Sequence, residues 1–217
     1  MDTADQKSSP TVFAIQKARR AFVTNTTISS YNWKQRQLYG LCRLLITHGE
    51  KLTQALYESM CRPERNLYPS WWKRNSCSPE VFLYKEYNIS KIKYDEELAV
   101  VLLDISRHYT ACQNTTAKPN KTAWGTIEQK DLPVGISMLL LDTANPIRFL
   151  FGSLAANIAV GNTVILASYH PHQADSFFLI LQRHLPEYLD SEAIHVLLGV
   201  ERDSSLLTKV DLISVFG

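Results

Sequence analysis

Cysteine and histidine have the widest range of chemistry in this 217-residue sequence, as nucleophiles, bases and metal ligands. No two cysteines form a Cys-x-x-Cys pair and none has a His at zinc-ligand spacing, so we expect reduced thiols. The four are Cys42, Cys61, Cys77 and Cys112. His170-Pro171-His172 presents two imidazoles, but a third ligand is not evident nearby. We therefore expect no metal site.

Two polar positions could either contact a ligand or end an element. Asp142 follows a short apolar run, at the carboxyl end of an expected parallel strand, where α/β proteins bind ligands. It also precedes Pro146 as a helix N-cap would, and we favour the cap. Gly161-Asn162 could approach a phosphate, but a helix C-cap followed by a turn also explains the glycine. We favour the cap here too.

The charge pattern excludes some partners. The net charge of +2 arises from 23 basic and 21 acidic residues spread along the chain, without the basic stripe that neutralises phosphates, so we expect no nucleic-acid binding. The first ten residues are polar, and no run approaches the roughly 20 apolar residues that span a bilayer. We expect a soluble, cytoplasmic protein without a membrane partner.

Residues 12–112 show helical spacing of apolar positions, which predicts four helices. Ser29 and Ser30 are candidate N-caps of the second helix, Gly49 is expected to end it, and Pro63 to end the third. Residues 63–79 are expected to form an irregular connection folded back onto the helices. Each expected helix has one apolar stripe. The four stripes are Val12, Ile15, the aliphatic part of Arg19 and Phe22; Leu38, Leu41 and Leu45; Leu52, Leu56 and Met60; and Leu98, Leu102, Ile105, Tyr109 and Cys112.

After residue 117 strands and helices alternate, which predicts an α/β fold. Strands are expected at 134–141, 163–166, 194–198 and 210–215, and helices at Pro146–Val160, 172–185 and 204–207. The aromatics expected to pack on the sheet are Phe149, Phe151, Phe177 and Phe178. The sequence thus predicts amino-terminal helices (1–117) followed by a partial doubly wound parallel sheet of Rossmann type (118–217). The glycine fingerprint of pyrophosphate binding is absent.

Three stretches carry a family resemblance. The first is Ala18-Arg19-Arg20-Ala21-Phe22 with Trp33-Lys34-Gln35-Arg36-Gln37-Leu38, and the second is Leu132-Pro133-Val134-Gly135. The third runs from Pro146 through Ala159-Val160-Gly161-Asn162-Thr163-Val164-Ile165-Leu166 to Tyr188-Leu189-Asp190 and Asp211-Leu212-Ile213. On these motifs the chain resembles the amino-terminal half of the aldehyde dehydrogenase superfamily, most closely its short branch acting on fatty and aromatic aldehydes. Pro146 and Gly161 lie fifteen residues apart, as in that branch.

The resemblance implies NAD or NADP as cofactor, at the positions of Asp142, Thr143, Ala167 and His170. The family's Lys-Pro-Ser-Glu, whose Lys and Glu bind the adenosine ribose, reads Ala167-Ser168-Tyr169-His170 here. A methyl group cannot donate a hydrogen bond, and each lost charge-assisted bond costs about 1.5 to 3 kcal/mol. We therefore expect weak or absent cofactor binding.

The catalytic positions depart from the family as well. Thr143-Ala144-Asn145-Pro146 puts Ala144 where the family has its oxyanion-donating Asn, and losing one such donor lowers the rate about 100- to 1000-fold. The family's base Glu and nucleophilic Cys lie beyond the position of Gly217, so we expect no catalytic residue in this chain.

Three hypotheses follow from the resemblance. The chain is a truncated, degenerate aldehyde dehydrogenase-like pseudoenzyme; or a portion of an active enzyme that oxidises an aldehyde to a carboxylic acid, in a setting such as fungal secondary metabolism; or a binding module. The module would form a homo- or hetero-oligomer, for example with a full-length relative, through the uncovered edge of strand 210–215. Ala144 and Ala167 favour the first hypothesis, and the edge places the module second.

Overall fold

The structure is a computed structural model. It describes residues 10–25, 27–28, 30–61, 96–112, 120–122, 125–127, 132–141, 146–168, 175–198 and 208–216.

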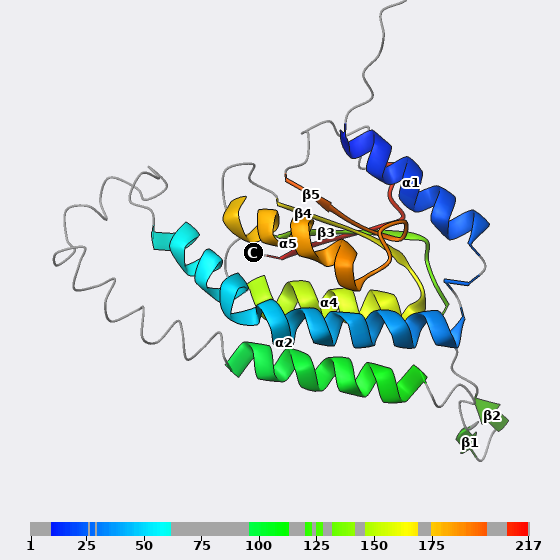
Figure 1. The fold of residues 1–217 in the computed structure, drawn as a ribbon. Coiled ribbons are helices and arrows are strands. Elements are labelled where there is room, and N and C mark those ends of the chain that lie inside the picture. The colour runs from blue at the N-terminus through cyan, green and yellow to red at the C-terminus, as the bar shows by residue number, and fades with distance from the viewer. Residues whose placement is uncertain are drawn as a thin grey trace, which may run out of the picture.

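A four-stranded parallel sheet forms the centre of the molecule (Figure 1). Its strands are β3 (Ile136–Leu141), β4 (Thr163–Ser168), β5 (Ile194–Leu197) and β6 (Leu212–Phe216), in the order β5-β4-β3-β6. The helix α4 (Pro146–Val160) connects β3 to β4, and α5 (Asp175–Tyr188) lies between β4 and β5 in the sequence. The predicted α/β fold with a Rossmann-like sheet is confirmed.

The two central strands are buried at every residue, as expected for a parallel sheet covered on both faces. Because side chains alternate along a strand, each of these strands contributes side chains to two core clusters, one on each face of the sheet. Ile136, Met138 and Leu140 face a smaller cluster with Ala14, Ile15 and Ala18 of α1 (Pro10–Thr24). Leu139 and Leu141 face a larger cluster with the other helices.

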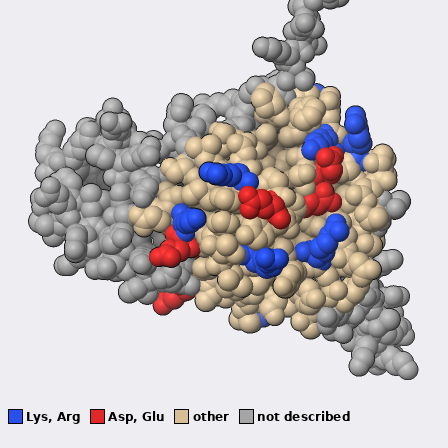
Figure 2. Space-filling model, viewed as in Figure 1, with Lys and Arg blue, Asp and Glu red and all other residues tan. Residues whose placement is uncertain are grey.

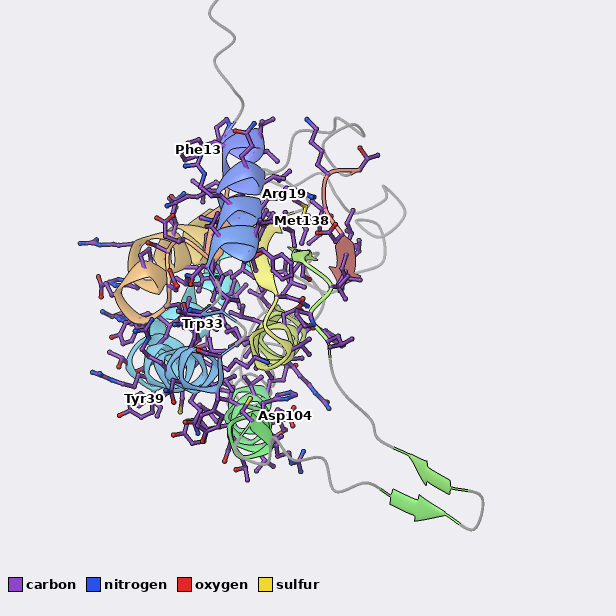
Figure 3. The ribbon with its side chains drawn as sticks, turned by 90° about the vertical axis from the view of Figure 1, so that its right-hand side faces the viewer. Phe13, Arg19, Trp33, Tyr39, Asp104 and Met138 are labelled. Atoms are coloured by element: carbon purple, nitrogen blue, oxygen red, sulfur yellow. The ribbon has the colours of Figure 1, made fainter. Side chains whose placement is uncertain are left out.

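The face of α1 that packs on the sheet differs from the predicted stripe. The buried residues are Thr11, Ala14, Ile15, Ala18 and Ala21, whereas Val12 and Phe22 are partly buried and Arg19 is exposed. Small alanines let the helix axis approach the strands, so the contact does not need the large side chains that the prediction used. Figure 3 shows Met138 beside α1, with Arg19 and Phe13 at its surface.

The second and third predicted helices are one continuous helix, α2 (Tyr31–Cys61). Ser30 caps it, since its Oγ accepts a hydrogen bond from the backbone N–H of Trp33 at 3.3 Å. Gly49 does not end the helix, contrary to the prediction. A Cβ at this position would lie 2.8 Å from Cδ2 of Leu98, so the glycine is explained by close packing against a neighbouring helix.

That neighbour is the helix over residues 96–112, shown in green in Figure 1. Its predicted stripe is confirmed, because Ile105 is buried and Leu98, Leu102, Tyr109 and Cys112 are partly buried against the larger cluster. On the same side, α4 and α5 lie on the sheet and α2 packs across both. This cluster draws residues from both sides of position 117, so the division into 1–117 and 118–217 stays a prediction.

The strands and helices of the sheet lie within a few residues of their predicted bounds. Pro146–Val160 is a helix over its whole predicted length. The helix α5 ends at Tyr188, three residues beyond the predicted end at 185, and Pro186 lies inside it. Phe151, Phe177 and Phe178 are buried as predicted, but Phe149 is 42% exposed because it lies on the outer side of α4.

Two short antiparallel strands were not predicted. β1 (Asn120–Thr122) pairs with β2 (Gly125–Ile127), and Figures 1 and 3 both show the pair standing away from the sheet. The predicted loop at 63–79 and helix at 204–207 lie outside the described residues. Within the described part of the chain, every helix is too short or too polar to cross a membrane. Figure 2 shows basic and acidic side chains intermixed on one face.

Candidate functional site

The carboxyl ends of the four parallel strands define one edge of the sheet, which is where α/β folds bind ligands. β3, β4, β5 and β6 end there at Leu141, Ser168, Leu197 and Phe216. The first turn of α4, starting at Pro146, lies at the same edge because the helix runs back antiparallel to β3. The fold thus has the carboxyl edge of a parallel sheet at which the sequence placed candidate ligand-binding residues.

Of the four predicted cofactor positions, the structure describes one. Ala167 lies on β4, pairs with Leu140 and Leu197, and is fully buried in the smaller core cluster. Asp142, Thr143 and His170 lie outside the described residues, as do Ala144 and Asn145. The cofactor site therefore stays a prediction.

The described residues at this edge are a poor fit to a dinucleotide. Leu141 and Leu197 are apolar and buried, and the hydroxyl of Ser168 belongs to a residue that is 3% exposed. In the described part of this edge, neither a carboxylate nor a lysine extends from the strand ends toward a ribose.

Gly161-Asn162, the second ambiguous motif, has a structural role at the opposite edge. Gly161 has φ of 102° and its N–H donates to Asn157 O at 3.0 Å, as expected of a glycine that ends α4. The buried Oδ1 of Asn162 accepts from the N–H groups of Val134 and Gly135 at 2.7 and 3.2 Å. Its Nδ2 donates to Asn157 Oδ1 at 2.8 Å. The predicted cap is confirmed, and Asn162 joins the end of α4 to the start of β3.

The thiols of Cys42 and Cys112 are described, and neither is in a disulfide bond. Burial raises the pKa of Cys42, and it raises the pKa of Cys112 against a smaller opposing effect of Lys34. A raised pKa keeps a thiol protonated and lowers its reactivity as a nucleophile. The Sγ of Cys112 lies 3.9 Å from Ala159 O, at the end of α4 remote from Pro146.

A histidine cluster between α2 and α5 was not predicted. The rings of His48 and His184 stack with centroids 4.1 Å apart, and Glu187 Oε1 lies 3.3 Å from His184 Nδ1. Burial lowers the pKa of His48; His184 and Lys51 lower it further, and Glu187 opposes them. His184 and Glu187 are one turn apart in a predicted helix, but His48 lies far away in the sequence. No local pattern could have joined the three.

No protein-family model matches the sequence, and no curated protein does. Solved aldehyde dehydrogenase structures match the fold. The chain is similar to Staphylococcus aureus AldH in a substrate-bound state, at 18% identity and a TM-score of 0.63, over 88% of this chain and 36% of that one. It is similar to succinic semialdehyde dehydrogenase from Streptococcus pyogenes with NADP+, at 12% identity and a TM-score of 0.66, over 99% and 42%. An NAD-dependent aldehyde dehydrogenase from Sinorhizobium meliloti matches at 14% identity and a TM-score of 0.60, over 93% and 36%.

At these identities the likeness shows the fold alone. The chain has a partial aldehyde dehydrogenase-like fold, as the resemblance predicted. It spans 36 to 42% of the length of the structures it matches.

Proposed function

We propose that this 217-residue chain keeps an aldehyde dehydrogenase-like fold but does not oxidise aldehydes by itself. The position of Cys112 carries the proposal. Oxidation through a thiohemiacetal needs a thiolate within bonding distance of the aldehyde carbon, beside the nicotinamide. Cys112 contacts the far end of α4, about 20 Å along the helix from the carboxyl edge of the sheet.

The electrostatic setting of the described thiols supports the same conclusion. Cys42 and Cys112 are partly buried against the core, and burial raises both pKa values. An activated cysteine has a lowered pKa. Ala144, which the resemblance puts at the oxyanion donor, further supports a chain without turnover.

The test is an absorbance assay for NADH or NADPH with hexanal and benzaldehyde as substrates. We expect no cofactor reduction above the blank. A known active aldehyde dehydrogenase added to the same mixture must give its full rate, which excludes inhibition by the preparation. Turnover that co-purifies with the chain and disappears in Cys61→Ser or Cys77→Ser would overturn the proposal.

The proposal also includes weak binding of the dinucleotide cofactor. With Ala167 buried and no donor extending from the described strand ends, we expect NAD and NADP to bind no more tightly than about 1 mM. Tryptophan fluorescence during a cofactor titration measures this directly. Micromolar binding of either dinucleotide contradicts it.

A binding module is the second candidate, favoured by the exposure of β6. Leu212, Ile213 and Val215 are 39, 37 and 59% exposed, whereas every residue of β3 and β4 is buried. Among the described strands, β6 pairs with β3 alone. Unpaired backbone groups on an apolar edge strand favour addition of a further strand from a partner.

A further inference from the structure

Two helices bring three potential metal ligands together on the side of the molecule where α2 crosses α5. His48 comes from α2, and His184 and Glu187 come from α5. One ligand atom from each side chain lies within 4.8 Å of the other two. Nδ1 of His184 and Oε1 of Glu187 are 3.3 Å apart. Two ligands bound about 2.1 Å from a tetrahedral ion are separated by nearly that distance.

One ring nitrogen of the histidine pair has no partner among the described residues. Nδ1 of His48 is buried and no described group forms a hydrogen bond with it, whereas Nδ1 of His184 has Oε1 of Glu187 at 3.3 Å. His48 is only 7% exposed. A buried polar atom without a partner costs about 1 to 3 kcal/mol, so packing alone does not explain the unpaired Nδ1 of His48.

Tyr188 is placed to select the tautomer of His48. Tyr188 Oη lies 3.4 Å from Nε2 of His48. When Nε2–H donates to that oxygen, the lone pair of the imidazole lies on Nδ1, the atom that lacks a partner. The two helices approach closely nearby, because no Cβ at Gly40 of α2 would fit beside Tyr188 O of α5.

We propose that His48, His184 and Glu187 bind one divalent transition-metal ion of the zinc type. Two imidazoles and a carboxylate are a ligand set that suits Zn²⁺, with water completing the coordination. The carboxylate of Glu187, which is more than half exposed, faces solvent at the rim of the cluster. An ion can therefore enter from that side without separation of the helices.

Binding requires one local rearrangement. The two rings are stacked with an interplanar angle of 20° and centroids 4.1 Å apart, so their lone pairs lie in separate, nearly parallel planes and do not converge on one ion. One imidazole must turn about its side-chain torsions while the helices stay in place. His184, which is less buried than His48, has the room to turn.

The test is calorimetric titration of ZnCl₂ into the untagged, EDTA-stripped 217-residue chain. We expect about one equivalent to bind. His48→Gln and His184→Gln should each weaken the affinity by more than about tenfold, since even outer partners of zinc ligands cost 10- to 100-fold. Glu187→Gln should weaken it less, and Tyr188→Phe by up to about tenfold. Cobalt(II) substitution should give the visible spectrum of a tetrahedral site that H184Q abolishes.

Two controls separate this site from other histidines. His195→Gln removes a histidine of β5 outside the cluster and should leave the titration unchanged. The double variant His170→Gln/His172→Gln tests the His-Pro-His motif. Absence of binding, equal affinity in H184Q, or loss of binding only in the double variant overturns the proposal. Should H48Q fail to fold, the half-buried His184 gives the decisive variant.

Discussion

Single residues decide how far the aldehyde dehydrogenase resemblance can be extended to chemistry. The alignment of motifs puts Ala167 at the position of a ribose-binding lysine. In the structure its methyl group is fully enclosed by the core cluster that includes Ile165 and Leu140. A longer side chain at this place has no open route to a cofactor. The packing around position 167 therefore fits the alanine found here and leaves no room for the lysine of the family motif.

A lysine at position 167 should damage the protein without restoring cofactor binding. Ala167→Lys buries an unpaired ammonium group, so we expect a loss of more than about 3 kcal/mol in the free energy of unfolding. Urea denaturation measures this loss. Ala111→Lys is the matched control, because Ala111 is exposed on the helix over residues 96–112. Stronger NAD binding by a stable A167K protein contradicts the packing argument.

His195 should make the free energy of unfolding depend on pH. Burial lowers its pKa, Lys17 of α1 lowers it further, and the nearby Glu192 carbonyl, Glu192 and Asp190 oppose the change. A folded-state pKa below the usual value of about 6.5 means that the unfolded chain binds the proton first. Stability is therefore complete above that value and falls as the pH drops below it.

His195→Gln should reduce this acid sensitivity. The unfolding free energy of the variant should fall less between pH 7 and pH 5 than that of the original protein, with the two curves running parallel above pH 7. Thermal unfolding across the pH series measures both. An equal acid dependence in the two proteins would show that other groups, such as His48, dominate it.

Helices and strands are joined at their ends by side chains that the element pattern alone does not reveal. Asn162 is 4% exposed, and its Oδ1 accepts hydrogen bonds from two backbone N–H groups just before β3. Its Nδ2 donates to Oδ1 of Asn157, which lies in the last turns of α4. The αβ connection is thereby fixed to the preceding strand. This role explains why Gly-Asn follows α4 without invoking a phosphate.

Asn162→Ala should destabilise the fold by about 2 to 3 kcal/mol, because two backbone donors lose their acceptor in a buried place. Asn157→Ala removes the bond to Asn162 and one to Ser153 O, and should cost about 1 kcal/mol. Urea unfolding of the single and double variants measures both effects and their coupling. A neutral N162A would disprove the link between the two elements.

The sequence predicted elements well where both ends carry local signals. Pro146 begins α4 and Gly161 follows its last residue, so the sequence predicted both ends of this helix correctly. Gly49 and Pro186 carry the same residue types but lie inside helices. The contact of Gly49 with Leu98 is a tertiary one that no local rule contains. For the same reason the cluster of His48 with His184 was not predictable.

At the scale of the whole molecule, the apolar edge at β6 favours association. We expect the purified chain to self-associate as its concentration rises, and Val215→Lys to shift it toward the monomer. Sedimentation velocity measures the equilibrium. Leu179→Lys is the matched control, since Leu179 is also half exposed but lies on α5. A chain that stays monomeric at every concentration contradicts the proposed self-association.

The opening helices are tied to partners synthesised much later. Trp33 Nε1 donates to Asp190 Oδ2 across 157 residues, and Arg19 donates to Lys209 O across 190. At 5 to 20 residues per second, a ribosome needs about 10 to 40 s to bridge the longer interval. During part of that time the apolar face of α1 lacks the sheet that covers it, and that of α2 lacks α4 and α5. The nascent chain should therefore depend on holding chaperones until β6 emerges.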